Sequence, residues 1–220
     1  MKKSLILFLC IIGSFSCVSQ KKDVIAKSTI KFEGKNINLR ELICTNGFYR
    51  YPNFQSNENI IFFEDGTFIK FISRKQIENN QQVVKLSDYA NYMEYKGQTN
   101  LIGYRGIYTI KQDTIIVHIY RPPTLLVAWS LDEEQYKVID QKTIKRISIR
   151  GLLKTDEEYY KESGRSFWIK DEENMHFIPV DSLPASDDSL KKYKWMWRNE
   201  SDWKAYMERV KAEKQKNKKK

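Results

Sequence analysis

The stretch Phe62 to Phe68 (FFEDGTF) decides the fold of this 220-residue chain. Asp65 and Gly66 stand between two aromatic and β-branched runs, and both residues tolerate the positive φ angles that a tight hairpin turn needs. The stretch therefore predicts two antiparallel strands, within residues 59–63 and 67–73, joined by a short turn.

Further turn signals continue this pattern along the chain. Each lies between runs rich in Ile, Val and Tyr, and helical periodicity is missing between residues 42 and 150. The region is therefore expected to form about eight sequential strands with short connections, which disfavours a parallel βαβ fold. The expected turns are residues 111–113, 121–123, 132–135 and 140–142.

An open meander of this length would leave two unpaired strand edges, and closure into a barrel removes both. We therefore predict an all-β fold, an antiparallel up-and-down barrel of about eight strands with a C-terminal helical extension. Such a barrel is wide enough for its own side chains and one small ligand. Residues 113–120 (DTIIVHIY) are apolar on both faces, so we expect another segment to cover this strand from outside.

Four stretches carry a resemblance to a known family. They are Gly47-Phe48-Tyr49, Phe62 to Thr67, Gly106-Ile107-Tyr108 with Asp113-Thr114-Ile115, and Tyr136 to Asp140 with Thr143-Ile144. Over roughly residues 40–150 the chain resembles uncharacterised bacterial lipoproteins that have a lipocalin-like, calycin-type β-barrel.

Lipocalins carry Gly-x-Trp on the first strand, and an Arg from the last strand packs over the Trp ring. Here Gly47 precedes Tyr49, which stands in the Trp position. The resemblance implies that Gly47 and Tyr49 help to close the barrel, with Arg146 or Arg150 as the partner of the ring. It also implies that these residues are structural and lie outside any binding site.

The N-terminus reads as an export signal. Lys2 and Lys3 precede an apolar run over residues 5–12, which is shorter than the roughly 20 residues needed to cross a bilayer. Ser16 before Cys17 resembles a relaxed bacterial lipobox, so we expect a signal peptide and a lipidated (palmitate-carrying) Cys17; ordinary secretion with cleavage after Ser19 is the alternative. Either way the protein is exported, and the first reading anchors it in the cell envelope, at the outer membrane.

The net charge of +10 is concentrated at the two ends of the chain. The leader holds two lysines, and residues 211–220 carry six lysines against Glu213, which leaves +3 between them. A groove that follows nucleic-acid phosphates is therefore not indicated, and we expect no nucleic-acid partner. The tail reads as a solvated helix end, or alternatively as a contact with anionic lipid near the anchor.

Residues 75–102 interrupt the meander with a polar stretch followed by SDYANYMEY. Insertions of this length in compact domains are commonly lids or binding loops. The Tyr and Met side chains of this segment would either gate an apolar ligand at the barrel mouth or plug the barrel end. The candidate ligand-binding residues are Phe48, Phe62, Phe68, Tyr92 and Trp129.

The C-terminal part is rich in Trp. We expect it to pack on the outer barrel face that carries Ile116 and Tyr120, because Trp usually buries its large surface. The alternative is an aromatic platform for sugar rings or a partner protein, formed by Tyr193, Trp195 and Trp197. A final helix is expected after Asn199 or Ser201, with an apolar stripe at helical spacing that consists of Trp203, Tyr206, Met207 and Val210.

These features divide the chain into five parts. His118 and His176 are the only histidines, no carboxylates or thiols flank them at ligand spacing, and the usual nucleophile and phosphate-binding motifs are missing. We therefore expect no enzyme, no catalytic residue, no metal and no cofactor. The parts are a signal peptide (1–16), a lipid anchor and linker (17–36), the barrel (37–153) with its insertion (75–102), a Trp-rich extension on the barrel (154–198), and a C-terminal helix with a Lys-rich tail (199–220).

Two hypotheses of function remain at this point. The first is an envelope lipoprotein whose barrel holds a small apolar or amphipathic ligand, with the membrane as a partner through the N-terminal lipid. The second is a structural or interaction lipoprotein whose barrel is filled by its own side chains and whose Trp-rich segment docks another envelope protein. The volume left inside the barrel distinguishes them.

Overall fold

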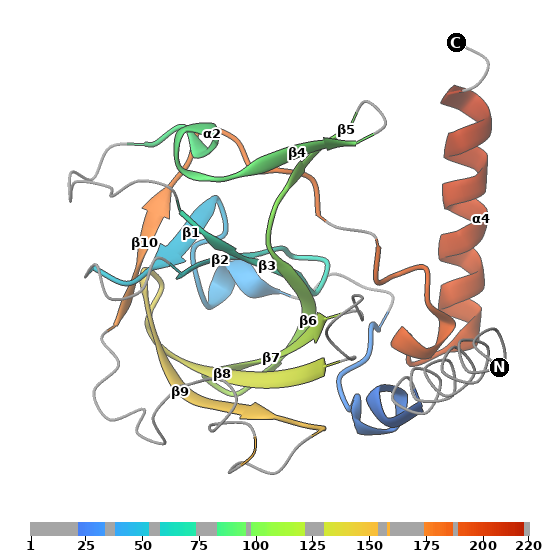
Figure 1. Cartoon of the computed structure of the whole chain (residues 1–220), viewed down its shortest axis with the longest axis horizontal. Coiled ribbons are helices and arrows are strands. Elements are labelled where there is room, and N and C mark those ends of the chain that lie inside the picture. Colours follow the sequence, from blue (N-terminus) through green and yellow to red (C-terminus); the bar gives the residue numbers. More distant parts are fainter. Residues whose placement is uncertain are drawn as a thin grey trace, which may run out of the picture.

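The computed structural model describes residues 22–33, 38–52, 58–73, 83–95, 98–121, 130–153, 158, 174–186 and 189–217. Its main feature is a closed barrel of eight strands in which every neighbouring pair is antiparallel, as the sequence predicts (Figure 1). The barrel strands are β1 (Gly47–Arg50), β2 (Glu58–Phe62), β3 (Thr67–Ile72), β6 (Tyr104–Lys111), β7 (Thr114–Arg121), β8 (Ser130–Asp140), β9 (Thr143–Gly151) and β10 (Met175–Pro179).

The β2–β3 hairpin forms where FFEDGTF predicts it. Gly66 has φ of 85°, the left-handed region that glycine reaches without steric cost. The Asp65 carboxylate accepts hydrogen bonds from the Thr67 backbone N–H (2.9 Å) and hydroxyl (2.6 Å), which fixes the turn. The strand register is therefore set by the geometry of the turn.

The strand that closes the barrel differs from the expected one. β10 lies within residues 154–198, which the sequence analysis assigned to an extension, and it pairs with β1 on one side and β9 on the other. The barrel therefore extends past residue 153, and β9 is not its last strand. Gly47 explains the close fit of β1 and β10, since a Cβ there would lie 2.0 Å from the Ile178 carbonyl oxygen.

β8 (Ser130–Asp140) also differs from the prediction, because it runs through the position of an expected turn. Residues 132–135 (DEEQ) were expected to form a turn, and they lie instead in the middle of β8, a single strand of 11 residues. The turn expected at residues 121–123 falls partly outside the described residues. The barrel therefore has eight strands, as predicted, but β8 contains an expected turn and β10 lies outside the region in which strands were expected.

The two ends of the barrel differ in their connections. At one end, which we call the turn end, β2–β3, β6–β7 and β8–β9 are joined by tight turns. The 3-10 helix η1 (Leu39–Glu41) covers this end, where Leu39 and Ile43 join the interior cluster and the Tyr49 hydroxyl donates to the Gln141 carbonyl (2.6 Å). The long connections after β1, β3, β7 and β9 lie at the opposite end, which we call the loop end.

The insertion after β3 packs on the outside of the barrel. It consists of α2 (Leu86–Tyr89) and a hairpin of β4 (Tyr92–Tyr95) and β5 (Gln98–Leu101). Leu86, Ala90 and Leu101 are buried against outward-facing side chains of β1, β2 and β3. In the part of the chain that the structure describes, the insertion therefore covers the outer wall.

A second outer face, on β6, β7 and β8, is covered by both ends of the described chain. Residues 22–33, which we expected to be a free linker, begin with a helix at 22–27 and bury Val24, Ile30 and Phe32 against this face. The C-terminal segment around η2 (Lys194–Met196) packs beside them, and Met196 is fully buried.

The final helix α4 (Glu200–Asn217) begins at this covered face and extends along one side of the molecule (Figure 1). Only Tyr206 in it is buried among the residues whose side chains are described. No helix in the described ranges has the length and apolar character to span a bilayer.

Candidate functional site

The turn-end half of the barrel interior is filled by aromatic rings. Phe62 lies at the centre of this group, with ring centroids at 5.5 Å from Tyr108, 6.2 Å from Phe68 and 6.2 Å from Tyr136. Each of these side chains is at most 2% exposed. Phe62 and Phe68 therefore face the interior as expected, but their surfaces are covered by the protein's own rings.

The other candidate ligand-binding residues lie elsewhere. Phe48 points to the outside of the barrel, where its ring packs edge-on against Phe71 at 5.6 Å, because it alternates with the inward-facing Tyr49. Tyr92 is partly buried in the same outer cluster. Trp129 and the proposed lipidation site Cys17 lie outside the described residues. Of the candidates that the structure describes, Phe62 and Phe68 are therefore the ones that face the interior.

Of the four residues expected to close the barrel, Gly47 and Tyr49 lie where β1 meets β10, whereas neither arginine packs over the Tyr49 ring. Gly47 and Tyr49 lie on β1 in register with β10, at the seam of the barrel. The guanidinium of Arg146 lies over Tyr51, 5.7 Å from the ring centroid, rather than over Tyr49. Arg150 points outward and donates to Glu133 (2.8 Å), because a bulge in the β8–β9 pairing separates it from the inward face of Arg146.

Four charged side chains meet inside the barrel, toward the loop end from the aromatic group. We call them the lumen charge centre; they are Glu58 on β2, Lys70 on β3, Glu134 on β8 and Arg146 on β9. Lys70 Nζ lies 3.0 Å from Glu58 Oε2 and 2.7 Å from Glu134 Oε1. Arg146 Nη1 lies 3.0 Å from Glu58 Oε2 and 3.6 Å from Glu134 Oε2.

Closure of the barrel brings these residues together. β2 and β3 are neighbours, β8 and β9 are neighbours, and the two pairs lie on opposite walls of the cylinder. Each ion pair from Lys70 to Glu134, or from Glu58 to Arg146, therefore crosses the interior. The side chains of Glu134, Lys70 and Arg146 are 1%, 6% and 8% exposed, whereas Glu58 at the start of β2 is 19% exposed.

The two cations keep Glu134 ionised. Burial alone would raise the pKa of this carboxyl group, but the charges of Lys70 and Arg146 outweigh the burial and hold the pKa below its usual value. The Tyr136 hydroxyl also donates to Glu134. Burial and the neighbouring carboxylate raise the pKa of Tyr136 well above its usual value, so Tyr136 stays neutral and acts as a donor.

A buried ion cluster is costly, and apolar side chains of the same volume would commonly stabilise a barrel as well or better. A further ion pair, between Arg121 and Asp132 (2.7 Å), lies on the same inward face nearer the loop end. The concentration of buried charges beside the aromatic group therefore marks a candidate site. Sequence reasoning missed Glu58, Lys70 and Glu134. The available signal was Lys70, which shares the inward face of β3 with Phe68 by strand alternation.

A second polar group lies on the outer wall, under the covered face of β6–β8. His118 is fully buried, and its Nε2 lies 3.2 Å from Glu133 Oε2. Its Nδ1 has no hydrogen-bond partner among the residues that the structure describes. Burial lowers the pKa of His118, and Arg150 and Lys31 add to this, although Glu133 acts in the opposite direction. His118 is therefore a neutral, buried side chain at neutral pH.

No cluster of three or more His, Cys, Asp or Glu side chains with the arrangement of a metal site occurs in the ranges that the structure describes. Comparison with known proteins adds no family: no family model, curated protein or solved structure matches the chain. The interpretation of the site therefore depends on its own geometry.

The Trp-rich segment is mostly packed. Trp195 contacts Tyr120 edge-on (5.7 Å) and Trp197 contacts Phe32 (5.5 Å), so both rings belong to the cover of the outer face. Tyr193 is stacked on Trp195 at 5.8 Å and remains 41% exposed. A surface cavity of about 370 Å³ lies beside Trp195 and Trp197.

Proposed function

We propose that this chain is an exported, lipid-anchored envelope protein whose barrel binds a small molecule with an acidic head group at the lumen charge centre. The leader and Cys17 support the anchor, and the closed antiparallel barrel supports a binding scaffold. We further propose that it acts by binding and not by catalysis, with no nucleic-acid partner.

One contact carries the proposal. A single oxygen, Glu58 Oε2, lies 3.0 Å from both Lys70 Nζ and Arg146 Nη1. The chain thus places its own carboxylate between two cations, in the position that a ligand carboxylate or phosphate would take. Glu58 is the most exposed of the four side chains and stands at the first residue of a strand, so it is the anion that can leave with least disruption.

The packing of the barrel interior limits where the remaining atoms of such a ligand can lie. The turn-end half is filled by Phe62 and its neighbouring rings, so a long apolar tail cannot run down to η1. A ligand whose head group lies at Lys70 and Arg146 would therefore direct its remaining atoms toward Tyr51 and the loop end. This geometry favours a small amphipathic acid over a purely apolar molecule.

Glu58→Gln tests the exchange directly. It removes the Glu58 carboxylate and keeps that of Glu134, so the net charge of the lumen charge centre rises by one. We expect decanoate to bind the variant roughly tenfold more tightly than the parent protein, since a hydrogen bond to a charged group contributes about 1.5–3 kcal/mol. Calorimetric titration measures the affinity, and decanol, which lacks the charge, should gain nothing.

Glu64→Gln is the matched control, because Glu64 pairs with Arg40 on the surface of the β2–β3 turn, at the other end of the barrel. It should leave decanoate binding unchanged. If the parent protein and Glu58→Gln both fail to bind decanoate, or bind decanol equally well, the acidic-ligand proposal is wrong and the filled-barrel alternative stands.

A second candidate function rests on Tyr193, which is largely exposed and stacked on the half-buried ring of Trp195. Trp195 also lines the cavity of about 370 Å³, an arrangement that fits docking of another envelope protein. Tyr193→Ala should abolish such docking without affecting stability, because the Tyr193 side chain is largely exposed. Cross-linking in whole cells, with and without this substitution, would show the loss of a partner.

A further inference from the structure

We propose that the basic second half of α4 lies on an anionic lipid surface, next to the acyl chain on Cys17, and so provides a second membrane contact. The inference rests on the proposed lipid anchor and extends it from a flexible tether to a fixed orientation. It follows from the positions of the two ends of the described chain.

The first observation is that residues 22–33 are attached to the start of α4. The Arg198 N–H donates to the Phe32 carbonyl (2.9 Å), and the Phe32 N–H donates to the Met196 carbonyl (2.8 Å). Arg198 also pairs with Glu33 (2.8 Å), and Lys31 Nζ donates to the Trp195 carbonyl (2.8 Å). The helix at 22–27 therefore lies beside the base of α4, where Figure 1 shows the blue and orange segments together.

The second observation is the short distance to the lipid. Cys17 precedes Lys22, the first described residue, by five positions. Even a fully extended chain of this length spans no more than about 18 Å. A lipidated Cys17 would thus hold the bilayer within this distance of the residues that pack against the base of α4.

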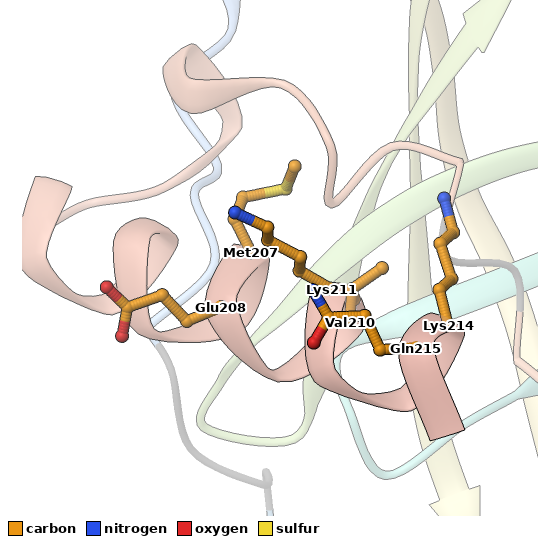
Figure 2. A pocket seen from close by; sticks show the side chains of 6 residues that line it. All are labelled: Met207, Glu208, Val210, Lys211, Lys214 and Gln215. Atoms are coloured by element: carbon orange, nitrogen blue, oxygen red, sulfur yellow. The ribbon is translucent and has the colours of Figure 1, made fainter. Parts of the chain in front are cut away.

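The third observation is the surface of α4 itself. After Tyr206 the helix has no buried side chain in its described part, and Met207 and Val210 are only half-buried. These two residues line a surface cavity of about 540 Å³ together with Glu208, Lys211, Lys214 and Gln215, and Figure 2 shows their side chains on this stretch of the helix. The exposed part of α4 is therefore mainly basic and offers only two half-buried apolar side chains.

The charge of the second half of α4 indicates the kind of surface that it contacts. From residue 208 to the end, the chain carries Arg209 and six lysines against Glu208 and Glu213. A surface with this charge excess attracts anionic head groups, and with only two half-buried apolar side chains the attraction is mainly electrostatic. An anionic lipid surface is therefore favoured over an apolar groove on a protein.

The test compares vesicle binding of the full chain, isolated in its acylated form, with that of a basic-face variant. On phosphatidylcholine vesicles both should bind equally through the acyl chain. When about a third of the lipid is phosphatidylglycerol, the parent should bind more tightly and the variant roughly 100-fold less tightly than the parent, since each basic residue near an anionic surface changes binding about fivefold. The variant is Lys211→Gln/Lys214→Gln/Lys216→Gln, and the control with the same charge change elsewhere is Lys85→Gln/Lys111→Gln/Lys142→Gln.

The outcomes separate the two proposals. The mass of the acylated chain reports the anchor, and a Cys17→Ser chain, run in parallel, reports the helix alone through salt-sensitive binding to anionic vesicles. An unmodified mass removes the anchor and with it the fixed orientation. An acylated protein that binds neutral and anionic vesicles equally, or a control that loses as much binding as the α4 variant, overturns the role of α4.

Discussion

Lys70 lies in β3 between apolar neighbours, and its side chain is only 6% exposed. Strand alternation places it on the same inward face as Phe68, and this direction could be read from the sequence. Its partners could not, because Glu134 is 64 positions away and meets Lys70 across the closed barrel. At the scale of one residue, the sequence thus predicts orientation but not the contact that gives the residue its role.

His118 allows a prediction about pH. Burial lowers its pKa in the folded protein, so between its unfolded pKa near 6.5 and the lower folded value the unfolded chain binds a proton that the folded chain does not. Stability should therefore fall as the pH drops below about 6.5. Glu133 favours the protonated ring and reduces the effect, while Arg150 and Lys31 increase it.

His118→Gln removes this titration and keeps a polar side chain of similar size. Urea unfolding at pH 7.5 and pH 5.5 measures the change: the parent should lose stability between the two values, and the variant should lose less. Equal losses in both proteins would show that His118 titrates normally and that its buried environment is wrongly assigned.

β8 shows how ion pairs with other strands can override a local turn signal. The sequence DEEQ at residues 132–135 is typical of a turn, yet it continues the strand because each carboxylate has a cationic partner. Asp132 pairs with Arg121 (2.7 Å), Glu133 with Arg150 (2.8 Å), and Glu134 with Lys70 (2.7 Å). The local signal was overruled by contacts from other strands, which a single sequence does not display.

α4 was predicted from its capping residues and apolar stripe, and a prediction about its two halves follows. Tyr206 is 5% exposed and its ring lies 5.3 Å from that of Trp197, whereas the side chains from Lys211 to Lys216 are exposed. Tyr206→Ala should lower the free energy of unfolding by about 2–4 kcal/mol, as expected for a large buried side chain. Lys211→Ala should change it by less than about 0.5 kcal/mol. Guanidinium unfolding measures the free energy of both variants. Equal losses would show that the second half of α4 is packed as tightly as the first.

The architecture of the whole molecule was largely predictable, because turn signals and alternation recur along the chain. The closing strand was not, since β10 is short and is separated from β9 by residues 152–174. The docking of residues 22–33 was also missed, because Val24 and Phe32 are scattered among polar residues and their partners lie far along the chain, on β6–β8 and around Met196. Long-range packing, and not local pattern, decides both features.

The lumen charge centre predicts non-additive mutations across the barrel. Lys70→Met alone leaves an excess negative charge inside, and Glu134→Gln alone leaves an excess positive charge, so each should cost about 3 kcal/mol or more. The double variant restores neutrality, with Glu58 still paired to Arg146, and should cost clearly less than the sum. Denaturant unfolding of the four proteins gives the coupling energy, and additive effects would show that the two side chains do not interact.

Closure by β10 is the central claim, because the lumen charge centre exists only if opposite walls of one cylinder face each other. The most direct measurement is a NOESY spectrum of the isotopically labelled protein. A closed barrel should give backbone cross-peaks between Phe48 and Ile178, in the β1–β10 register, beside those between Tyr49 and Ile60 on the neighbouring β1–β2 pair. Cross-peaks for β1–β2 without any for β1–β10 would show an open sheet, in which the two halves of the lumen charge centre do not face each other.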